Sequence, residues 1–199
     1  MSIKKYKIGI FGLWHLGCVL SAAWSKLGHN VIGFDYDKKL INNISQVKVP
    51  IFEPGLNDLI EDRLENKNLF FSNDLEDLSD CDFIFLSYDT PVNDDDSIDL
   101  TILQNSVKDL VKVMKNNSIL IISSQVPVGY CSDLRKKLKN KNKTLDLAYS
   151  PENLRLGDAI SCYLNPERII LGTSNKLTEE ACSKLFLSIT DKIQKMSFP

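Results

Sequence analysis

The sequence predicts an α/β protein whose sheet is doubly wound and mostly parallel, with helices on both faces. Three observations carry this prediction. Short apolar runs of strand length alternate with segments whose apolar residues recur at helical spacing. The first apolar run ends in Gly12, and a helical pattern follows directly. The second apolar run ends in Asp35. Such alternation is typical of consecutive βαβ units, which form parallel sheets.

The first of these units is the clearest. Residues 6–11 form a short apolar run that predicts a buried strand. Residues 15–27 predict a helix, which Gly28 would end. The apolar face of that helix comprises Leu16, Val19, Leu20, Ala23, Trp24 and Leu27. Residues 30–35 predict the second strand, so this unit contains two parallel strands joined by a helical crossover.

The same alternation continues along the rest of the chain. We expect helices at 37–44, 55–64, 100–114, 130–138 and 178–190, and a helical turn at 75–78. We expect strands at 69–71, 83–87, 118–123, 145–149 and 168–171. Two prolines mark 49–55 as a loop. The pattern has no internal repeat, so we treat residues 1–199 as one domain.

The composition is that of an ordinary globular protein and argues against several functions. The chain has 199 residues, of which 43% are hydrophobic and 25% charged, with a formal net charge of −2. This balance lacks the basic footprint of nucleic-acid-binding proteins, so we expect no nucleic-acid partner. No apolar run reaches the roughly 18 residues of a membrane span, so we expect no membrane association and a cytoplasmic location.

The cysteines and the charge runs give no metal signal. The five cysteines are Cys18, Cys81, Cys131, Cys162 and Cys182. Their number is odd and none forms a C-x-x-C pair, which argues against a disulfide framework and a zinc site. The acidic run at 94–96 predicts a turn, because three adjacent carboxylates in a loop splay apart. The basic stretch at 135–143 predicts a solvated helix end. We therefore expect reduced thiols and no metal.

The junction between the first strand and the first helix has the sequence GLWHLG, residues 12–17. In Rossmann-like folds the dinucleotide-binding fingerprint G-x-G-x-x-G lies at the corresponding junction. Gly12 supplies the tight turn, and Gly17 allows the helix to pack closely on the sheet. Trp14 replaces the middle glycine, so its ring must turn away or a phosphate must sit further out. The predicted cofactor site comprises Gly12, Trp14, His15, Leu16 and Gly17. The alternative is a glycine turn in a domain that binds no nucleotide.

Asp35 identifies the cofactor that this turn would hold. It ends the second predicted strand, where an acidic side chain hydrogen-bonds the ribose hydroxyls of NAD and repels the additional phosphate of NADP. The amino end of the helix adds N–H donors and a partial positive charge for the pyrophosphate. The sequence therefore predicts a Rossmann-like domain that binds NAD. FAD also occupies such folds, but nothing in the sequence indicates a flavin.

Five further stretches follow this turn in a fixed order. They are IFEPGL at 51–56, DTP at 89–91 with DL at 99–100, VPVG at 126–129, SPENLRLGDAI at 150–160 and PERIILG at 166–172. As an ordered set after a dinucleotide-binding turn, they resemble the UDP-glucose/GDP-mannose dehydrogenase family over nearly the whole chain. Taken alone, IFEPGL predicts a proline-shaped connector with a helix start at Gly55, and in the context of the family we also expect it to border the substrate.

The resemblance implies an NAD-dependent nucleotide-sugar dehydrogenase that serves polysaccharide biosynthesis. Such an enzyme oxidises the C6 hydroxyl of a nucleotide sugar to a carboxylate and uses two NAD per turnover. A cysteine attacks the aldehyde to give a thiohemiacetal, a second hydride leaves, and the thioester is hydrolysed.

The resemblance also assigns individual residues. Its cofactor site comprises Gly12, Leu16, Gly17, Asp35, Thr90, Pro91 and Ser124. Glu152 matches a glutamate that acts as general base or positions a water, and Gln125 stands where the family has a threonine. The implied substrate site comprises Glu152, Asn153, Leu154 and Arg155. From spacing alone, Glu152 and Arg155 would read as a surface ion pair. Departures from the family pattern occur at Trp14, Asp89, Gln125 and Leu156.

The resemblance further implies that a family enzyme needs more chain than these 199 residues. The nucleophilic cysteine belongs to a second α/β domain, after a long helix that carries the homodimer contact. We expect that helix to start at or just beyond residue 199. None of the five cysteines lies in a glycine-rich setting, so we expect this chain to bind cofactor without completing the oxidation.

Two other functions stay open at this point. One is a non-catalytic module that binds a dinucleotide or a nucleotide sugar through a degenerate Rossmann turn, which Trp14 and Gln125 favour. The other is a hydride-transferring enzyme of the β-hydroxyacid dehydrogenase type. That enzyme would share the first βαβ unit, but it would leave IFEPGL and the PENLR stretch unexplained.

Overall fold

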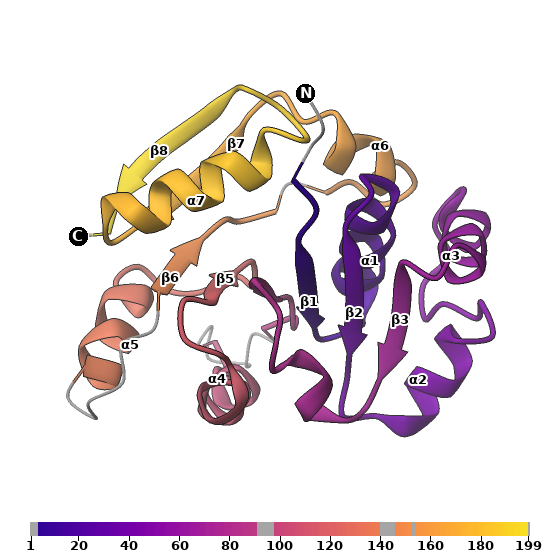
Figure 1. Cartoon of the computed structure of the whole chain (residues 1–199), viewed down its shortest axis with the longest axis horizontal. Coiled ribbons are helices and arrows are strands. Elements are labelled where there is room, and N and C mark those ends of the chain that lie inside the picture. Colours follow the sequence, from indigo (N-terminus) through magenta and orange to yellow (C-terminus); the bar gives the residue numbers. More distant parts are fainter. Residues whose placement is uncertain (1–3, 91–97, 140–145, 153, 199) are drawn as a thin grey trace.

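The computed structural model describes residues 4–90, 98–139, 146–152 and 154–198, whose strands form one sheet (Figure 1). The eight strands follow the order β3-β2-β1-β4-β5-β6-β7-β8. Their bounds are β1 Lys7–Phe11, β2 Asn30–Phe34, β3 Leu69–Ser72, β4 Phe83–Leu86, β5 Ile119–Ile122, β6 Asp146–Tyr149, β7 Ile169–Thr173 and β8 Ile193–Ser197. The pairs from β3 to β6 are all parallel, β7 is antiparallel to β6, and β8 is parallel to β7. The predicted mostly parallel sheet is confirmed.

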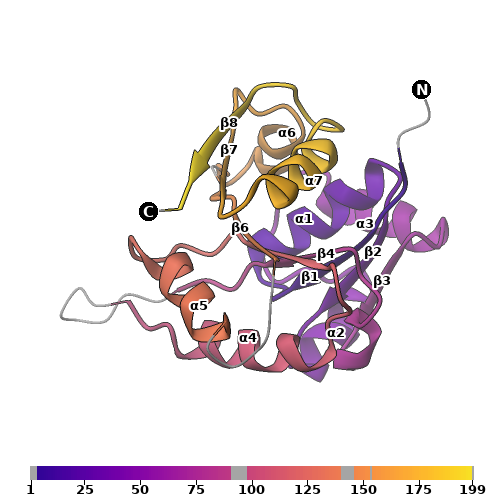
Figure 2. The same ribbon diagram turned by 60° about the vertical axis from the view of Figure 1, so that its left-hand side comes forward.

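Helices cover both faces of the sheet, as predicted. Figure 2 shows α1, α3, α6 and α7 on one side of the strands and α4 and α5 on the other. The helices are α1 His15–Lys26, α2 Lys38–Ile44, α3 Leu56–Glu65, α4 Thr101–Val113, α5 Tyr130–Lys139, α6 Ala159–Leu164 and α7 Lys176–Phe186, with a 3₁₀ turn at Leu75–Leu78. Each face has its own core, because successive strand residues point to opposite sides.

Helix α1 lies deepest in the first core. Every residue from Leu16 to Ser25 is buried, and Trp24 is fully enclosed. The predicted apolar stripe accounts for one side of this helix. Small residues such as Ala22 and Ser25 are buried as well, and α3 and α6 both pack against this helix, which the apolar periodicity alone does not predict. The amino end of α1 is thereby fixed at the carboxyl ends of β1 and β4.

Two elements were not predicted, and each has a physical reason. Helix α6 has only six residues, which is too short for a helical apolar period. Strand β8 pairs with β7, but four of its five residues are exposed, so its sequence IQKMS has no buried run. The helix expected at 178–190 lies instead at Lys176–Phe186, because Asn175 caps it by accepting a hydrogen bond from the Thr178 N–H at 2.8 Å.

Candidate functional site

Both glycines of the β1–α1 turn are required by the geometry around them. Gly12 has a φ of +100°, a left-handed conformation that side chains rarely adopt. A Cβ on Gly17 would lie 1.8 Å from the Gly12 carbonyl oxygen, where no atom fits. The buried Ser87 hydroxyl, just after β4, donates to the same Gly12 oxygen at 2.9 Å. The turn and the first helical turn are therefore in direct backbone contact, as the fingerprint predicts.

The amino end of α1 lacks a side-chain cap. Trp14 is the residue before the helix, and its side chain makes no capping hydrogen bond. The side chain is 46% exposed, so the indole ring turns away from the core. The first-turn N–H groups of a helix have no intrahelical acceptor, and here no side chain caps them. They are available to an anionic ligand.

Asp35 directly follows β2 and closes the other side of this turn. It is 6% exposed, and its Oδ2 accepts the Leu13 N–H at 2.9 Å. Its Oδ1 accepts the Asp37 N–H at 3.1 Å, and the Tyr88 phenol lies within electrostatic reach of the carboxylate. Burial and the charge of Asp35 raise the pKa of Tyr88, which keeps that phenol neutral. A ribose that binds Asp35 would therefore lie close to a neutral phenol.

The loops after β4 and β5 meet at the same edge of the sheet. The Thr90 hydroxyl donates to the Gln125 backbone oxygen at 2.8 Å. The buried Ser124 hydroxyl donates to the Leu86 carbonyl at 3.2 Å. Three residues predicted for the site, Thr90, Ser124 and Gln125, are thus brought together. The Gln125 side chain is exposed, and Pro91 lies outside the described residues.

A cavity of about 570 Å³ contains the charged residues of the predicted substrate site. It lies where β5 and β6 end, since Ser123 and Ser150 line it together with Glu152 and Arg155. The Leu154 N–H donates to Glu152 Oε2 at 2.6 Å, which fixes that carboxylate against its own loop. Ligands bind outside the carboxyl ends of parallel strands in folds of this type. Asn153 lies outside the described residues.

The residues that line this cavity differ from two expectations drawn from the sequence. Among the described residues, no ion pair joins Glu152 to Arg155, so the surface-pair alternative has no support there. Glu167 and Arg168, from the PERIILG stretch, also line the cavity. From the sequence, Arg168 is expected in the PERIILG stretch and at the start of a strand, without a site role, because residues 13 positions beyond Arg155 give no local sign that they fold back beside it.

His15 and Glu53 connect the β1–α1 turn to the start of α6. His15 Nε2 lies 3.0 Å from Glu53 Oε2. Glu53 is 1% exposed and also accepts the Gly157 N–H at 3.1 Å and the Ala159 N–H at 2.8 Å. Burial opposes ionisation of Glu53, but hydrogen bonds from Ala159, His15 and Gly157 outweigh it and lower the pKa. The IFEPGL stretch is therefore more than a connector, and His15 contacts Glu53.

The thiols are unactivated. Cys18, Cys81, Cys131 and Cys182 are buried, and burial raises the pKa of each thiol. Cys162 borders the cavity, and its pKa is raised by desolvation and by its contact with Asp158, whose Oδ2 lies 3.5 Å away. A nucleophilic cysteine needs a lowered pKa. None of the five has the environment of a nucleophile.

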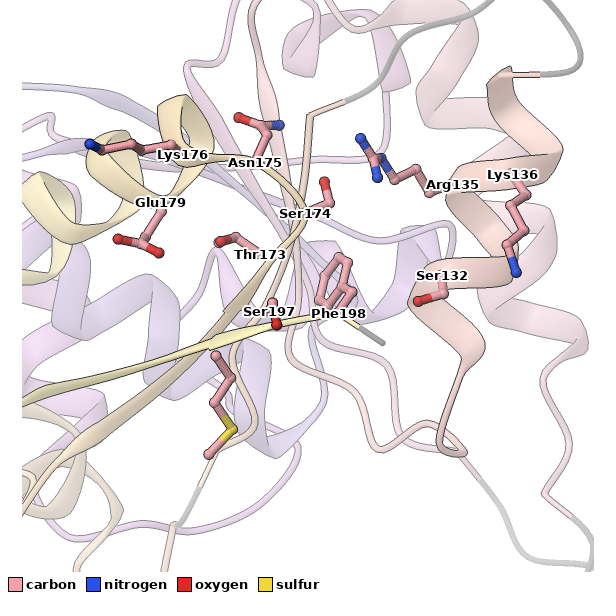
Figure 3. Close-up of a pocket in the computed structure, with 11 residues that line it drawn as sticks. Ser132, Arg135, Lys136, Thr173, Ser174, Asn175, Lys176, Glu179, Ser197 and Phe198 are labelled. Carbon is pink, nitrogen blue, oxygen red and sulfur yellow. The ribbon is translucent and has the colours of Figure 1, made fainter.

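A second cavity, of about 560 Å³, holds no residue of the predicted site. It lies between α5, the start of α7 and the ends of β7 and β8, at the amino end of β6 (Figure 3). Figure 3 shows the Arg135 guanidinium directed toward Ser174, while Lys136 and Lys176 point away. Because β7 is antiparallel to β6, this cavity is on the edge opposite the β1–α1 turn.

Two kinds of feature are absent from the described part of the chain. Within those residues, no helix is both long and apolar enough to cross a membrane. The same residues contain no group of three or more histidine, cysteine or acidic side chains placed to hold a metal ion.

The parallel sheet, the glycine turn, the uncapped helix and the buried carboxylate after β2 together define a dinucleotide-binding domain of the Rossmann type. Residues 6–190 match the model of the UDP-glucose/GDP-mannose dehydrogenase family, NAD binding domain. The chain belongs to this family, and the matched region is its NAD-binding domain.

Relatives of known name agree with this membership. A UDP-glucose 6-dehydrogenase from Rickettsia bellii is 29% identical over 185 residues, which cover 92% of this chain and 43% of the relative. A GDP-mannose dehydrogenase from Pseudomonas aeruginosa, solved as a ternary complex, is 25% identical with a TM-score of 0.89. That match covers 96% of this chain and 46% of the solved one. A UDP-glucose dehydrogenase from Pyrobaculum islandicum has the same fold, with 22% identity and a TM-score of 0.91 over 99% of this chain and 47% of that one. The chain thus spans less than half the length of these relatives.

Proposed function

We propose that this chain is the NAD-binding part of an oxidoreductase that oxidises the C6 hydroxyl of a nucleotide sugar to a carboxylate. The observation that carries the proposal is the β1–α1 turn, where the uncapped start of α1 faces a buried carboxylate after β2. This arrangement, in a chain of the UDP-glucose/GDP-mannose dehydrogenase family, supports NAD as cofactor.

The residues of the turn fit a dinucleotide. The absence of a side chain at Gly17 lets the start of α1 lie directly against the Gly12 carbonyl, and the indole of Trp14 is 46% exposed. The N–H groups at the start of α1 would hold the pyrophosphate, and Asp35 would hold the adenosine ribose. When bound, NAD supplies the hydride acceptor for the oxidation. Asp35 would also repel the additional phosphate of NADP.

The cavity at the ends of β5 and β6 supports the substrate class. Arg155 and Arg168 line it together with Glu152 and Glu167, and guanidinium groups bind phosphate oxygens in a bidentate manner. We infer that these arginines bind the diphosphate of the nucleotide sugar. Glu152, held by the Leu154 N–H, would then accept a proton from the sugar or orient a water. The exposed amide of Gln125 would contact the sugar by hydrogen bonds.

We also propose that the whole enzyme has a nucleophilic cysteine in a second α/β domain and forms a homodimer through a long helix. We further propose a role in polysaccharide biosynthesis and a cytoplasmic location. The raised pKa values of the five thiols support the first of these, because this chain lacks an activated thiol among them.

A binding experiment tests the proposal. The chain is titrated by calorimetry with NAD, and then with UDP-glucose and with GDP-mannose in the presence of NAD. We expect NAD to bind, together with one of the two nucleotide sugars. We expect Arg155→Gln to lower the affinity for that nucleotide sugar at least about tenfold, because one charge-assisted contact is lost. Lys38→Gln, on the exposed start of α2, is the matched charge control. NAD binding without binding of either sugar would contradict the substrate assignment, and absence of NAD binding would contradict the whole proposal.

A further inference from the structure

Glu53 lies where three separate segments of the chain meet. It precedes α3, and it contacts His15 at the start of α1 and the backbone of residues 157–159 at the start of α6. These partners are 38 residues before it and 104 to 106 residues after it in sequence. Figures 1 and 2 both show α6 packed beside α1. A single buried carboxylate therefore joins the dinucleotide turn to the loop that follows Glu152.

The hydrogen bonds fix the chemistry of this junction. Oε1 accepts the Ala159 N–H, and Oε2 accepts the Gly157 N–H and contacts His15 Nε2. An ionised carboxylate has no proton to donate, so His15 Nε2 must carry the proton that lies between them. His15 is 15% exposed and also within electrostatic reach of Asp89, after β4. The contact with Glu53 therefore holds the His15 ring in place.

The two connected segments have different tasks under the proposed function. His15 is the first residue of α1, whose N–H groups face the expected pyrophosphate. Gly157 is two residues after Arg155, in the loop that lines the cavity. A movement of either segment would stretch a hydrogen bond to a carboxylate that is 1% exposed. Since water cannot replace a lost partner at such a site, the two segments resist separate movement.

We propose that Glu53 is a positioning residue that couples the dinucleotide turn to the loop carrying Glu152 and Arg155, so that a ligand on the turn stiffens the loop. This inference rests on the proposed function, because it takes the turn to be the NAD site and the loop to be part of the substrate site. Coupling between sites is reciprocal, so a ligand in the cavity also strengthens binding at the turn.

Matched substitutions separate the coupling from general stability. Glu53→Gln keeps the shape of the side chain, but its NH₂ group must face the N–H of Gly157 or of Ala159. His15→Leu removes the ring donor, whereas His15→Gln keeps an amide donor at a similar reach. Glu61→Gln, on the exposed side of α3, makes the same chemical change away from the junction.

The experiment measures hydrogen exchange of the Gly157 and Ala159 amides in the whole chain, with and without NAD. Without ligand, we expect His15→Leu to accelerate exchange at both amides about fivefold or more, within the usual range of coupling between sites. We expect His15→Gln and Glu61→Gln to exchange like the wild type. With NAD, we expect slower exchange at both amides in the wild type and in His15→Gln, and no change in His15→Leu or Glu53→Gln.

The possible failures are distinguishable. Unchanged exchange at Gly157 and Ala159 in His15→Leu, or NAD binding that leaves these amides unaffected in the wild type, would overturn the coupling role of Glu53 while the NAD site stands. Failure of the wild type to bind NAD would overturn the proposed function. If Glu53→Gln does not fold, the His15 variants decide the question.

Discussion

Gly17 gives the sharpest prediction about the cofactor turn. In Gly17→Ala the new Cβ would lie 1.8 Å from the Gly12 carbonyl oxygen, whereas real Cβ contacts stay above 3.0 Å. The backbone of α1 or of the turn must therefore move by more than 1 Å. Overpacking of this kind costs about 1–3 kcal/mol of stability. For a domain of this size, each kcal/mol lowers the melting temperature by about 2–4 °C.

The same movement shifts the N–H groups at the start of α1 away from a bound pyrophosphate. Loss of one hydrogen bond to a charged group costs about 1.5–3 kcal/mol, so we expect NAD affinity to fall at least about tenfold. Thermal unfolding and calorimetric titration with NAD measure the two effects separately. Gly28→Ala is the control, because Gly28 has a φ of +90° with nothing within 4 Å of a Cβ. That variant should lose stability through backbone strain and keep its NAD affinity. Gly17→Ala with unchanged NAD affinity would refute the reasoning.

Three further predictions concern the residues around the turn and the cavity. Because the pKa of Glu53 is lowered in the folded state, its ionised form stabilises the fold fully above about pH 4.5, its ordinary pKa, and this stabilisation is lost as the pH falls through the lower folded-state pKa. The difference in unfolding free energy between wild type and Glu53→Gln, measured by urea unfolding, should therefore be about 1–3 kcal/mol at pH 7 and shrink below pH 4.5. A gap that does not depend on pH would contradict this sign. Ser87→Ala should cost about 1 kcal/mol in the same assay, because the Gly12 oxygen loses its buried donor, and an unchanged stability would argue against that hydrogen bond. Iodoacetamide should label only Cys162 in the native chain, and slowly at pH 7, since its pKa is raised; rapid labelling would indicate an activated thiol.

Local chemistry made the cofactor turn predictable from the sequence. Gly12 and Gly17 are placed by steric requirements that act over a few residues, and Asp35 follows a strand that is buried and non-polar after its first residue. The helix end at Gly28 and the buried stripe of α1 follow from the same short-range rules. These features need no knowledge of the rest of the fold.

The features that were missed depend on contacts far apart in sequence. Glu53 reads as part of a proline-rich connector until the fold brings residues 157–159 against it. Tyr88 gives no local sign that it approaches Asp35 from the end of β4, two strands away in the sheet. Strand β8 is an exposed edge strand whose pairing with β7 comes from the sheet and not from its own hydrophobicity.

The most direct test of the central claim is the ratio of NAD to NADP affinity in the wild type and in Asp35→Asn, measured by calorimetry on the same preparation. Asp35 accepts the Leu13 N–H at 2.9 Å, and asparagine can keep that contact through its amide oxygen while losing the charge. We predict that the wild type binds NAD more tightly than NADP and that Asp35→Asn weakens NAD and brings the two affinities closer. Equal or tighter binding of NADP by the wild type would contradict the role given to Asp35 and, with it, the assignment of the cofactor.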